Sequence, residues 1–256
     1  MGIYIFSFKK NYIYDLIQTT SLSLISTRLY TTSSKKRYTK AERSNIIIES
    51  PLNDIIIGLI LGDGHLQKRT IKGHTRFMYA QSSLRQHHFN YFNHVLSLFT
   101  AYISSDFVLK PRSFVDKKTG KTYGSVNFAT LTLPCFDYFR QVFYNSENKK
   151  ICPLNIKELL TLRGLAYWIM DDGSLQNKGL HLNTYGFTLE EVVNLKNAVE
   201  NLFAYQSPIK CSIHSHKKGF RIYIWQESMD IVRSQISQFM HEDMLYKINS
   251  DIKNIY

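Results

Sequence analysis

The sequence predicts an α+β protein built from two similar halves, each running helix, two strands, helix, two strands, helix. The main observation is an apolar segment ending in Asp-Gly that occurs twice, at residues 55–64 and 162–173. Each copy is followed by alternating stretches broken at turn residues and then by an amphipathic stretch. With 256 residues the chain can bury one large core or two smaller ones.

We divide the chain into a leader at residues 1–45, a first half at 46–150 and a second half at 151–256. The leader is basic, rich in Ser and Thr and poor in acids, which is typical of a mitochondrial transit peptide. Arg28-Leu29-Tyr30 would be its processing signal. The alternative is an in-frame leader of an open reading frame inside an intron. We expect the leader to be poorly ordered, apart from a short helix over 3–17.

In the first half, Ser50 and Pro51 predict the start of a buried helix that ends at Asp63, because a hydroxyl cap followed by proline favours helix initiation. Residues 83–86 have the spacing of a capping box. The other elements are expected as follows: a hairpin over 67–82 with its turn near Gly73, a helix from Ser83 to Phe99, strands over 107–112 and 123–133, and a helix over 136–144.

The second half repeats this order. Its apolar helix is expected from about Asn155 to Asp172, after Pro153. Thr188 and Glu191 have capping-box spacing and predict a helix to Phe203. The other elements are expected as follows: a hairpin over 174–187 with Lys178-Gly179 near its turn, strands over 210–216 and 219–225, and a helix over 229–240.

The charge of the chain indicates a polyanionic partner. It has 32 Lys and Arg against 20 Asp and Glu, a formal net charge of +12, which attracts nucleic acid or an acidic membrane surface. No segment of eighteen apolar residues occurs, so we expect no membrane span. Basic residues in the body recur between apolar ones, as in sheet faces that follow a phosphate backbone. The alternative is an ordinary basic, soluble surface.

Cysteine and histidine usage gives no metal site. Cys135, Cys152 and Cys211 are odd in number and far apart, which indicates a reducing compartment and argues against a zinc finger or a disulfide framework. The pairs at 87–88 and 214–216 contain histidines without a cysteine or an acid at ligand spacing. We therefore interpret these histidines as solvated or facing nucleic acid.

The two apolar segments end in the same way. Asp63-Gly64-His65-Leu66-Gln67 stands beside Asp172-Gly173-Ser174-Leu175-Gln176, and 109 residues separate the two acids. Apolar helices with small residues on one side can pack closely, and a glycine past the end permits the turn that stops the helix. If the copies pack as a pair, their acids lie side by side, where carboxylates can hold divalent ions.

Both copies resemble the motif of the LAGLIDADG homing endonucleases, in the form that carries two motifs on one chain. Ile56 to Gly64 matches the nine-letter motif, and Leu165 to Gly173 matches it again. The departures are Leu61 and Gly62 in the first copy and Tyr167, Trp168, Met170 and Asp171 in the second. The resemblance covers about residues 53–247.

The resemblance implies a monomer of two pseudo-symmetric αββαββα halves, with a saddle of antiparallel β-sheets over double-stranded DNA. It implies Mg²⁺-dependent cleavage of both strands at an intron insertion site in the mitochondrion, with Mn²⁺ able to substitute. Two alternatives remain open. One is a maturase that binds its host group I intron RNA, and the other is a DNA-binding protein on the same fold without catalysis.

The resemblance also implies site residues. Asp63 and Asp172 would be the catalytic acids and metal ligands, with backbone oxygens of Gly62 and Asp171 beside them. Alignment places Asp172, rather than Asp171, opposite Asp63. Lys150 and Lys247 would position water and stabilise the departing oxygen. The residues expected to contact DNA are Gln67, Lys68, Arg69, Arg76, Lys110, Arg112, Gln176, Lys178, His181, Asn183, Lys210, His214, Arg221 and Tyr223.

Overall fold

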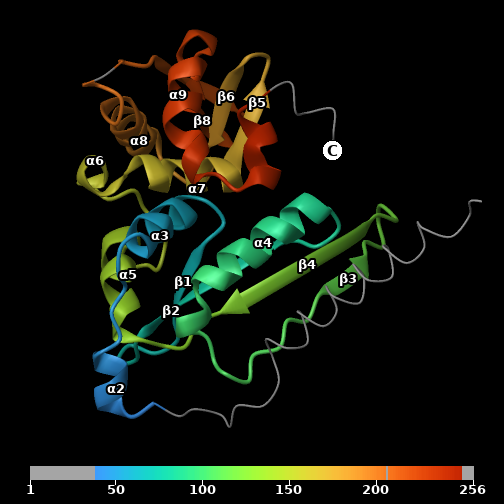
Figure 1. Cartoon of the computed structure of the whole chain (residues 1–256), viewed down its shortest axis with the longest axis vertical. Coiled ribbons are helices and arrows are strands. Elements are labelled where there is room, and N and C mark those ends of the chain that lie inside the picture. The colour runs from blue at the N-terminus through green and yellow to red at the C-terminus, as the bar shows by residue number, and fades with distance from the viewer. Residues whose placement is uncertain (1–37, 206, 250–256) are drawn as a thin grey trace, which may run out of the picture. The chain divides into compact units, whose positions relative to one another are not determined.

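A computed structural model describes residues 38–205 and 207–249 and contains two four-stranded antiparallel sheets (Figure 1). Their strand orders are β1-β2-β4-β3 and β5-β6-β8-β7. The second order repeats the first, so the predicted α+β fold with a duplicated plan is confirmed. Residues 104–108 group apart from the rest of the described chain and form a turn in which Phe107 N donates to Ser104 O.

The elements have the following bounds. The first half contains α2 (Lys40–Ser44), α3 (Leu52–Leu61), β1 (His65–Lys68), β2 (Thr75–Ser82), α4 (Gln86–Leu98), β3 (Arg112–Val115), β4 (Thr122–Ala129) and α5 (Asp137–Phe143). The second contains α6 (Ile156–Leu159), α7 (Leu162–Asp172), β5 (Gly173–Gln176), β6 (Gly179–Asn183), α8 (Leu189–Asn201), β7 (Cys211–His216), β8 (Gly219–Ile224) and α9 (Met229–Ile236), then a 3₁₀ turn at Glu242–Lys247.

The two motif helices, α3 and α7, pack against each other at the centre of the described chain (Figure 1). Ile56, Leu59 and Ile60 of α3 are fully buried. A Cβ atom at Gly58 would overlap the carbonyl oxygen of Gly164, so the absence of a side chain lets the two backbones touch. The close helix pairing expected from small residues is therefore present.

Each sheet has one apolar and one polar face. Helix α4 packs on β2 and β4, and α8 packs on β7 and β8. In the second sheet the inward side chains Leu182, Ile222 and Ile224 are fully buried, while Asn183 and Arg221 alternate with them on the other face. This is the alternation expected for antiparallel strands that cover a core on one side.

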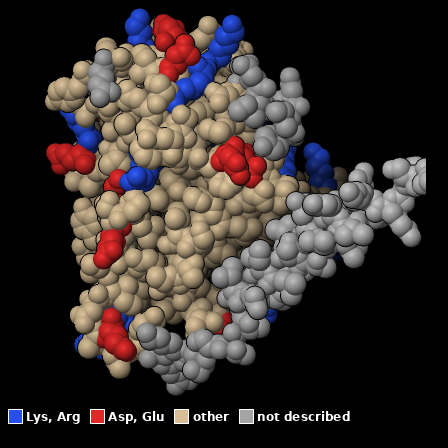
Figure 2. Space-filling model, in the orientation of Figure 1, with Lys and Arg blue, Asp and Glu red and all other residues tan. Residues whose placement is uncertain are grey.

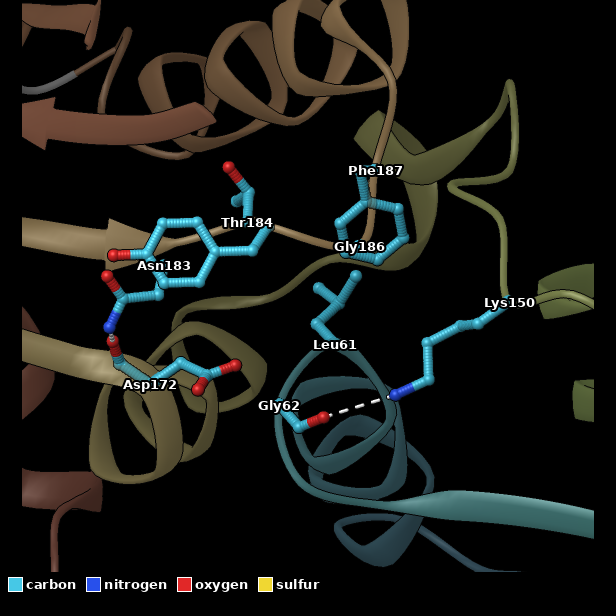
Figure 3. Close-up of a pocket in the computed structure, with 9 residues that line it drawn as sticks. Leu61, Gly62, Lys150, Asp172, Asn183, Thr184, Gly186 and Phe187 are labelled. Atoms are coloured by element: carbon cyan, nitrogen blue, oxygen red, sulfur yellow. Dashed lines mark hydrogen bonds between the residues drawn. The ribbon is translucent and has the colours of Figure 1, made fainter. Parts of the chain in front are cut away.

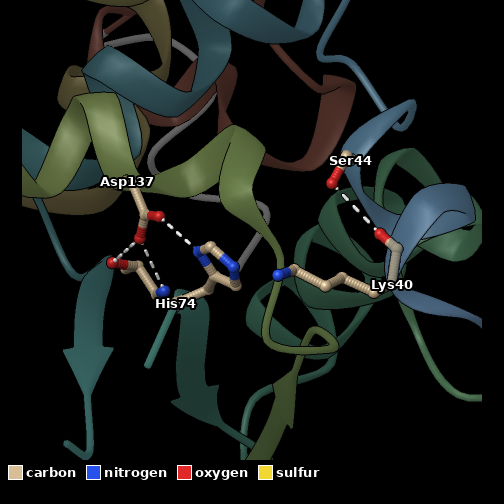
Figure 4. Close-up of polar contacts among 5 residues, drawn as sticks. Lys40, Ser44, His74 and Asp137 are labelled. Carbon is tan, nitrogen blue, oxygen red and sulfur yellow. Dashed lines mark hydrogen bonds and ion pairs between the residues drawn. The ribbon is translucent and has the colours of Figure 1, made fainter. Parts of the chain in front are cut away.

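A polar contact fixes the loop after β1 to the start of α5 (Figure 4). His74 Nδ1 lies 2.7 Å from Asp137 Oδ2, and Thr75 donates to Asp137 Oδ1 through its backbone N (2.8 Å) and its hydroxyl (2.7 Å). Burial alone would raise the pKa of Asp137, but the hydrogen bonds from His74 and Thr75 hold it below its ordinary value. The loop is thereby anchored on the side of the sheet that carries α5.

Two expected helix starts are wrong. Helix α3 begins at Leu52, with Pro51 at the N-cap and no side-chain cap, so Ser50 does not cap it. Helix α4 begins at Gln86 without a capping box. Ser83 N instead donates to Gly124 O at 3.2 Å, which ties the chain to the neighbouring strand at the residue that was expected to cap the helix. The capping box of Thr188 and Glu191 is confirmed, with both of its hydrogen bonds present.

Other boundaries also differ from expectation. The strand expected over 107–112 is β3, which starts only at Arg112, after Pro111, a residue that cannot donate to a strand ladder. The single helix expected over 155–172 is two helices, because Thr161 caps α7 by accepting from Gly164 N. Strand β4 ends at Ala129, where the expected strand continued to 133, and α9 ends at Ile236 and gives way to a 3₁₀ turn.

The end of the expected leader is structured. Residues 40–44 form α2, with a capping box between Thr39 and Glu42, and Ser44 Oγ donates to Lys40 O (Figure 4). The helix expected over 3–17 and Arg28-Leu29-Tyr30 lie outside the described residues. Within the part of the chain that is described, no helix has the length and apolar character needed to cross a membrane.

Candidate active site and nucleic-acid interface

The C-terminal ends of α3 and α7 bring the two motif acids into one electrostatic environment. The backbone N of Asp63 donates to the side chain of Asp171 at 3.1 Å, across the helix pair. Burial and then the charge of Asp63 raise the pKa of Asp172 to about 7, while Lys247 and Lys150 oppose the rise. Burial likewise raises the pKa of Asp63, although that residue keeps an exposed edge. The charge of Asp63 therefore acts on the carboxyl group of Asp172.

Both candidate lysines reach the helix ends. Lys150 Nζ donates to the carbonyl oxygens of Ile60 (2.7 Å), Gly62 (3.1 Å) and Gly64 (3.0 Å). Lys247 Nζ donates to the carbonyl oxygen of Asp171 at 2.7 Å. A cation at a helix C-terminus is favoured by the unpaired carbonyl groups there. Each lysine thus reaches the motif helix of its own half.

The lysines are partly to fully buried and lie among carboxylates. Burial lowers the pKa of Lys150 and of Lys247, and the negative charges of the neighbouring aspartates partly restore it. The carbonyl oxygens of Gly62 and Asp171, which the sequence proposes as metal ligands, are the ones that receive these lysine bonds. A carbonyl oxygen has two lone pairs, so each bond leaves one acceptor direction.

A cavity of about 200 Å³ opens beside the site. Figure 3 shows Asp172 and Gly62 on one side of it, with Lys150 reaching the Gly62 carbonyl from the opposite direction. Its lining also includes residues 183–187, which run from the last residue of strand β6 toward helix α8. Asn183 Nδ2 donates to the carbonyl oxygen of Asp172 at 2.9 Å. The end of the second sheet is therefore joined to the end of α7.

Two residues at the site, Tyr79 and Gln81, were not expected from the sequence. Gln81 Nε2 donates to Asp63 Oδ2 at 2.6 Å, and Tyr79 OH donates to Asp171 Oδ1 at 2.7 Å. Both belong to the inward face of β2, whose other members are Thr75 and Phe77. One feature of the sequence could have indicated Gln81. It ends the row of inward-facing residues on β2, and a polar side chain at the end of such a row needs a polar partner.

The donor set suits a hard divalent cation. No cluster of three or more His, Cys, Asp or Glu side chains that could hold a metal occurs among residues 38–205 and 207–249. Asp172 instead offers carboxylate oxygens at the edge of the cavity, and Asp63 offers its own at the end of the paired helix. Mg²⁺ is commonly bound by one or two carboxylates, with water and substrate phosphates completing its shell. The residues present therefore fit such an ion together with a bound phosphodiester.

The polar face of the first sheet carries several of the expected DNA contacts. Gln67 Oε1 accepts from Arg76 Nε at 2.9 Å and from Arg69 Nε at 3.4 Å. The strand register places Arg112 of β3 on the same face, next to Ser125. Lys68 and Lys110 are exposed, but Lys68 pairs with Thr75 and therefore points to the opposite side of β1 from Gln67. This face therefore presents arginine side chains, two of which are oriented by hydrogen bonds to the neutral amide of Gln67.

The polar face of the second sheet is aromatic and rich in histidine. The rings of His181 and His214 both pack against Tyr223, with centroids 4.9 Å and 5.1 Å away. His181 is only 5% exposed beneath these rings, so the structure corrects the expectation that it is freely available to DNA. Arg221 stands on the same face as His214, its register partner.

The remaining expected contacts lie toward the ends of the second sheet. Gln176 and Lys178 are exposed at the tight turn between β5 and β6. Lys210 Nζ lies 5.9 Å from the ring of Trp225 and 4.0 Å from Glu227. On the face of the molecule in Figure 2, basic and acidic side chains are scattered and leave a broad uncharged area between them. The positive charge does not gather there.

Two halves of one plan, joined through paired helices that each end in an acid, define the fold and site of a LAGLIDADG protein. The model of the LAGLIDADG DNA endonuclease family matches residues 53–232. The chain belongs to this family.

Known proteins agree with this assignment. The chain is 36% identical over 151 residues to intron-encoded endonuclease ai4 of Dictyostelium discoideum, covering 58% of this chain and 91% of that protein. It is 31% identical over 210 residues to cytochrome b mRNA maturase bI2 of Saccharomyces cerevisiae, covering 78% of this chain but only 48% of the maturase.

Among solved structures, the fold is similar to that of homing endonuclease I-WcaI bound to its DNA recognition sequence. The TM-score is 0.73 at 23% identity, and the match covers 88% of this chain and 97% of that one. At this identity the likeness shows the fold.

Proposed function

We propose that this protein is a homing endonuclease that cuts both strands of DNA at an intron insertion site by divalent-metal-dependent hydrolysis. The observation that carries the proposal is the pair of acids, Asp63 and Asp172, at the ends of packed helices, with a lysine from each half reaching the same helix ends. A paired arrangement of this kind supplies one set of groups for each strand of a duplex.

Burial and the charge of Asp63 raise the pKa of Asp172, and a cation bound beside the two carboxylates would relieve this repulsion. When bound, Mg²⁺ would lower the pKa of a water molecule and neutralise charge on the scissile phosphate. Asp63 and Asp172 would hold it, while Gln81 fixes the Asp63 carboxylate. Lys150 and Lys247 carry positive charge next to the position of the phosphate, where it would offset the charge that develops on the departing oxygen. Mg²⁺ is the expected ion, with Mn²⁺ as a substitute.

Recognition would use the polar faces of the two sheets. Arg76, Arg112 and Arg221 are suited to phosphates and guanine edges, while the rings of His214 and Tyr223 offer stacking and polar edges. A two-stranded ribbon fits the major groove of B-DNA. Because the two faces differ, arginine-rich in one half and aromatic in the other, we expect a target that is only loosely palindromic.

The test is cleavage of the uninterrupted insertion-site sequence by purified protein with Mg²⁺. Wild type should produce a staggered double-strand break, and the junctions that contain the intron should stay intact. Asp63→Asn and Asp172→Asn should abolish cutting and leave DNA binding in place. Failure of wild type to cut the uninterrupted allele, or cutting by the double variant, would remove the enzyme claim.

A second candidate function is assistance to splicing of the host intron RNA. It is favoured by the similarity to a protein named a cytochrome b mRNA maturase. A splicing assay with the same variants separates the two activities, since a maturase acts without the metal-binding acids. Splicing that survives Asp63→Asn and Asp172→Asn would establish a maturase role beside the nuclease. Sequence-specific DNA binding without cutting would instead support the non-catalytic alternative.

We further propose that the protein acts as a monomer in the mitochondrion. Both acids and both lysines come from one chain, so no second copy is needed to complete the site. The basic segment at residues 1–37 supports import or an intron-encoded origin. Removal of residues 1–37 should leave cleavage in vitro unchanged, and sedimentation should give the mass of one chain.

A further inference from the structure

We propose, resting on the nuclease function above, that Asp171 is a positioning residue that holds the metal-binding acid of the other half, Asp63. The two residues are neighbours only in the folded chain, since 108 residues separate them. Asp171 stands where the motif of the first half has Gly62. It is one of the positions at which this chain departs from the family pattern.

The side chain of Asp171 fills space that Gly62 leaves open. A Cβ atom on Gly62 would lie 2.5 Å from the Cβ of Asp171 and 2.6 Å from its Oδ2. These distances are far inside van der Waals contact, so the side chain of residue 171 and any side chain on residue 62 exclude each other. The pair is therefore complementary, with a carboxyl group in one half and no side chain in the other.

Asp171 closes a ring of hydrogen bonds around Asp63. Its Oδ2 accepts from the backbone N of Asp63 at 3.1 Å, and its Oδ1 accepts from Tyr79 OH at 2.7 Å. Gln81 Nε2 lies 3.2 Å from Tyr79 OH and 2.6 Å from Asp63 Oδ2. Asp171 thus holds the backbone of Asp63, and Gln81 holds its carboxylate. The hydroxyl of Tyr79 is hydrogen-bonded to both Asp171 and Gln81.

Tyr79 gives this ring a rigid base. It is 1% exposed, and its ring packs on Tyr91, Phe92 and Phe128 with centroids 6.5, 6.1 and 6.0 Å away. A side chain enclosed in this way has little freedom to move its hydroxyl. Asp63 is therefore held in position by the core of the first half, through Tyr79 and Gln81, as well as by α7.

The second half lacks the matching ring. In the first sheet His65 pairs with Met78, and in the second sheet the equivalent residue Ser174 pairs with His181. Leu182 is therefore the second-half equivalent of Tyr79, and Thr184 is the equivalent of Gln81. Thr184 Oγ1 is committed to Phe220 O at 2.7 Å. Asp172 is held instead through its carbonyl oxygen by Asn183. The arrangement around Asp63 is thus particular to the first half and depends on Asp171.

The central test compares Asp171→Ala with Asp171→Asn on the full chain. We measure the single-turnover cutting rate at saturating protein, the DNA dissociation constant without divalent ions, and Mn²⁺ affinity by calorimetric titration into the protein–DNA complex. Asp171→Ala should cut about 10–100-fold more slowly and bind Mn²⁺ more weakly, with DNA affinity within about threefold. Residues that support metal ligands have effects of this size.

Asp171→Asn should recover most of the rate. The amide oxygen can accept from Asp63 N, and the amide NH₂ can donate to the Tyr79 oxygen, so both bonds survive with the tyrosine hydroxyl turned around. Recovery by the isosteric amide would show that hydrogen bonding carries the effect. Equal cutting and equal Mn²⁺ affinity for wild type and Asp171→Ala would overturn the proposal.

A packing control separates hydrogen bonding from space filling. The exchange variant Gly62→Ala with Asp171→Gly places a methyl group on the other side of the interface and refills part of the space without the carboxyl group. It should melt near the wild-type temperature yet remain slow. A wild-type rate in this variant would show that Asp171 only fills space.

If Asp171→Ala does not fold, Tyr79→Phe carries the test, because it removes one hydroxyl and keeps the ring. It should slow cutting about threefold to tenfold, as expected for loss of the hydroxyl that donates to Asp171 and accepts from Gln81, and an unchanged rate would overturn the proposal. If wild type itself does not cut DNA, the nuclease function fails, and Mn²⁺ binding alone decides: equal affinity in wild type and Tyr79→Phe would then overturn the role of Asp171.

Discussion

Gln81 and Asp63 are joined by a hydrogen bond of 2.6 Å between the side-chain amide nitrogen and a carboxylate oxygen. The contact links the end of strand β2 to the end of helix α3. It places a neutral donor on one oxygen of the acid and leaves the other oxygen for a cation.

We expect Gln81→Ala to lower the cutting rate by about 10–100-fold, because the Asp63 carboxylate loses the group that orients it. Gln81→Glu should be at least as harmful, since a second negative charge beside Asp63 raises the pKa of that acid. Nicking assays with saturating protein measure both. Gln141→Ala, at an exposed position on α5, is the matched control. A Gln81→Ala protein as fast as this control would contradict the assignment.

Asp172→Asn should stabilise the metal-free protein at alkaline pH while abolishing cutting. The pKa of Asp172 is raised by burial and by Asp63 to about 7 in the folded state, from an ordinary 3.8. The folded state therefore retains a proton that the unfolded state releases, and stability falls as pH rises from about 4 to about 7. Asparagine removes this cost, which is on the order of 4 kcal/mol at pH 8.

Thermal unfolding in a chelator at pH 4.5 and pH 8 checks this prediction. The melting temperature of Asp172→Asn should exceed that of wild type at pH 8 and approach it at pH 4.5. Asp230→Asn, an exposed acid on α9, is the control and should show no such pH-dependent difference. An equal offset at both pH values would mean that the effect does not come from titration of Asp172.

Gly58→Ala should destabilise the fold strongly, because the new methyl group would overlap the carbonyl oxygen of Gly164 on the partner helix. Forcing two packed helices apart costs on the order of 1–3 kcal/mol or more. Gly186→Ala is a sharp control, since a Cβ atom there meets nothing within 4 Å. Urea unfolding of the two variants measures the difference, and equal midpoints would contradict the close helix contact.

His181→Gln should flatten the acid side of the stability profile. Burial first, and then the positive charges of Arg221 and His214, lower the pKa of His181 to about 4. Because the unfolded histidine has an ordinary pKa of 6.5 and binds the proton more readily, stability is lost as pH falls from about 6.5 toward 4. Glutamine does not titrate and so removes this contribution.

Urea unfolding between pH 4 and pH 7 checks this expectation. Wild type should lose more stability than His181→Gln over this range, because the ring stays neutral among His214, Tyr223 and Arg221 in the folded protein. Parallel profiles for the two proteins would show that His181 titrates in the folded state as it does in the unfolded one.

The fold could be predicted from the sequence to the level of element order. The repeated apolar segments, the capping box at Thr188 and the turn at Lys178 each gave an element that the structure contains. The errors fell at boundaries. Ser83 was expected to cap a helix and is instead bonded to Gly124 on the adjacent strand, a partner that a local pattern cannot identify.

The candidate site was likewise predicted only in part from the sequence. Asp63, Asp172, Lys150 and Lys247 were selected by motif and symmetry, and the structure brings all four to the helix ends. The contacts that organise them were not expected. Gln81 reaches Asp63 because β2 runs beside the end of α3, and sequence distance gives no measure of that approach.

The sequence by itself determined the duplication, the acids that end each copy and the apolar faces, because these follow from local composition and period. Only the tertiary structure decided which side chain supports which acid. Asp171 and Gly62 occupy the same place in the two motif copies, yet one carries a carboxyl group that fills the space the other leaves. That complementarity arises from packing two unlike helices at contact distance, and it exists only once both halves are folded together.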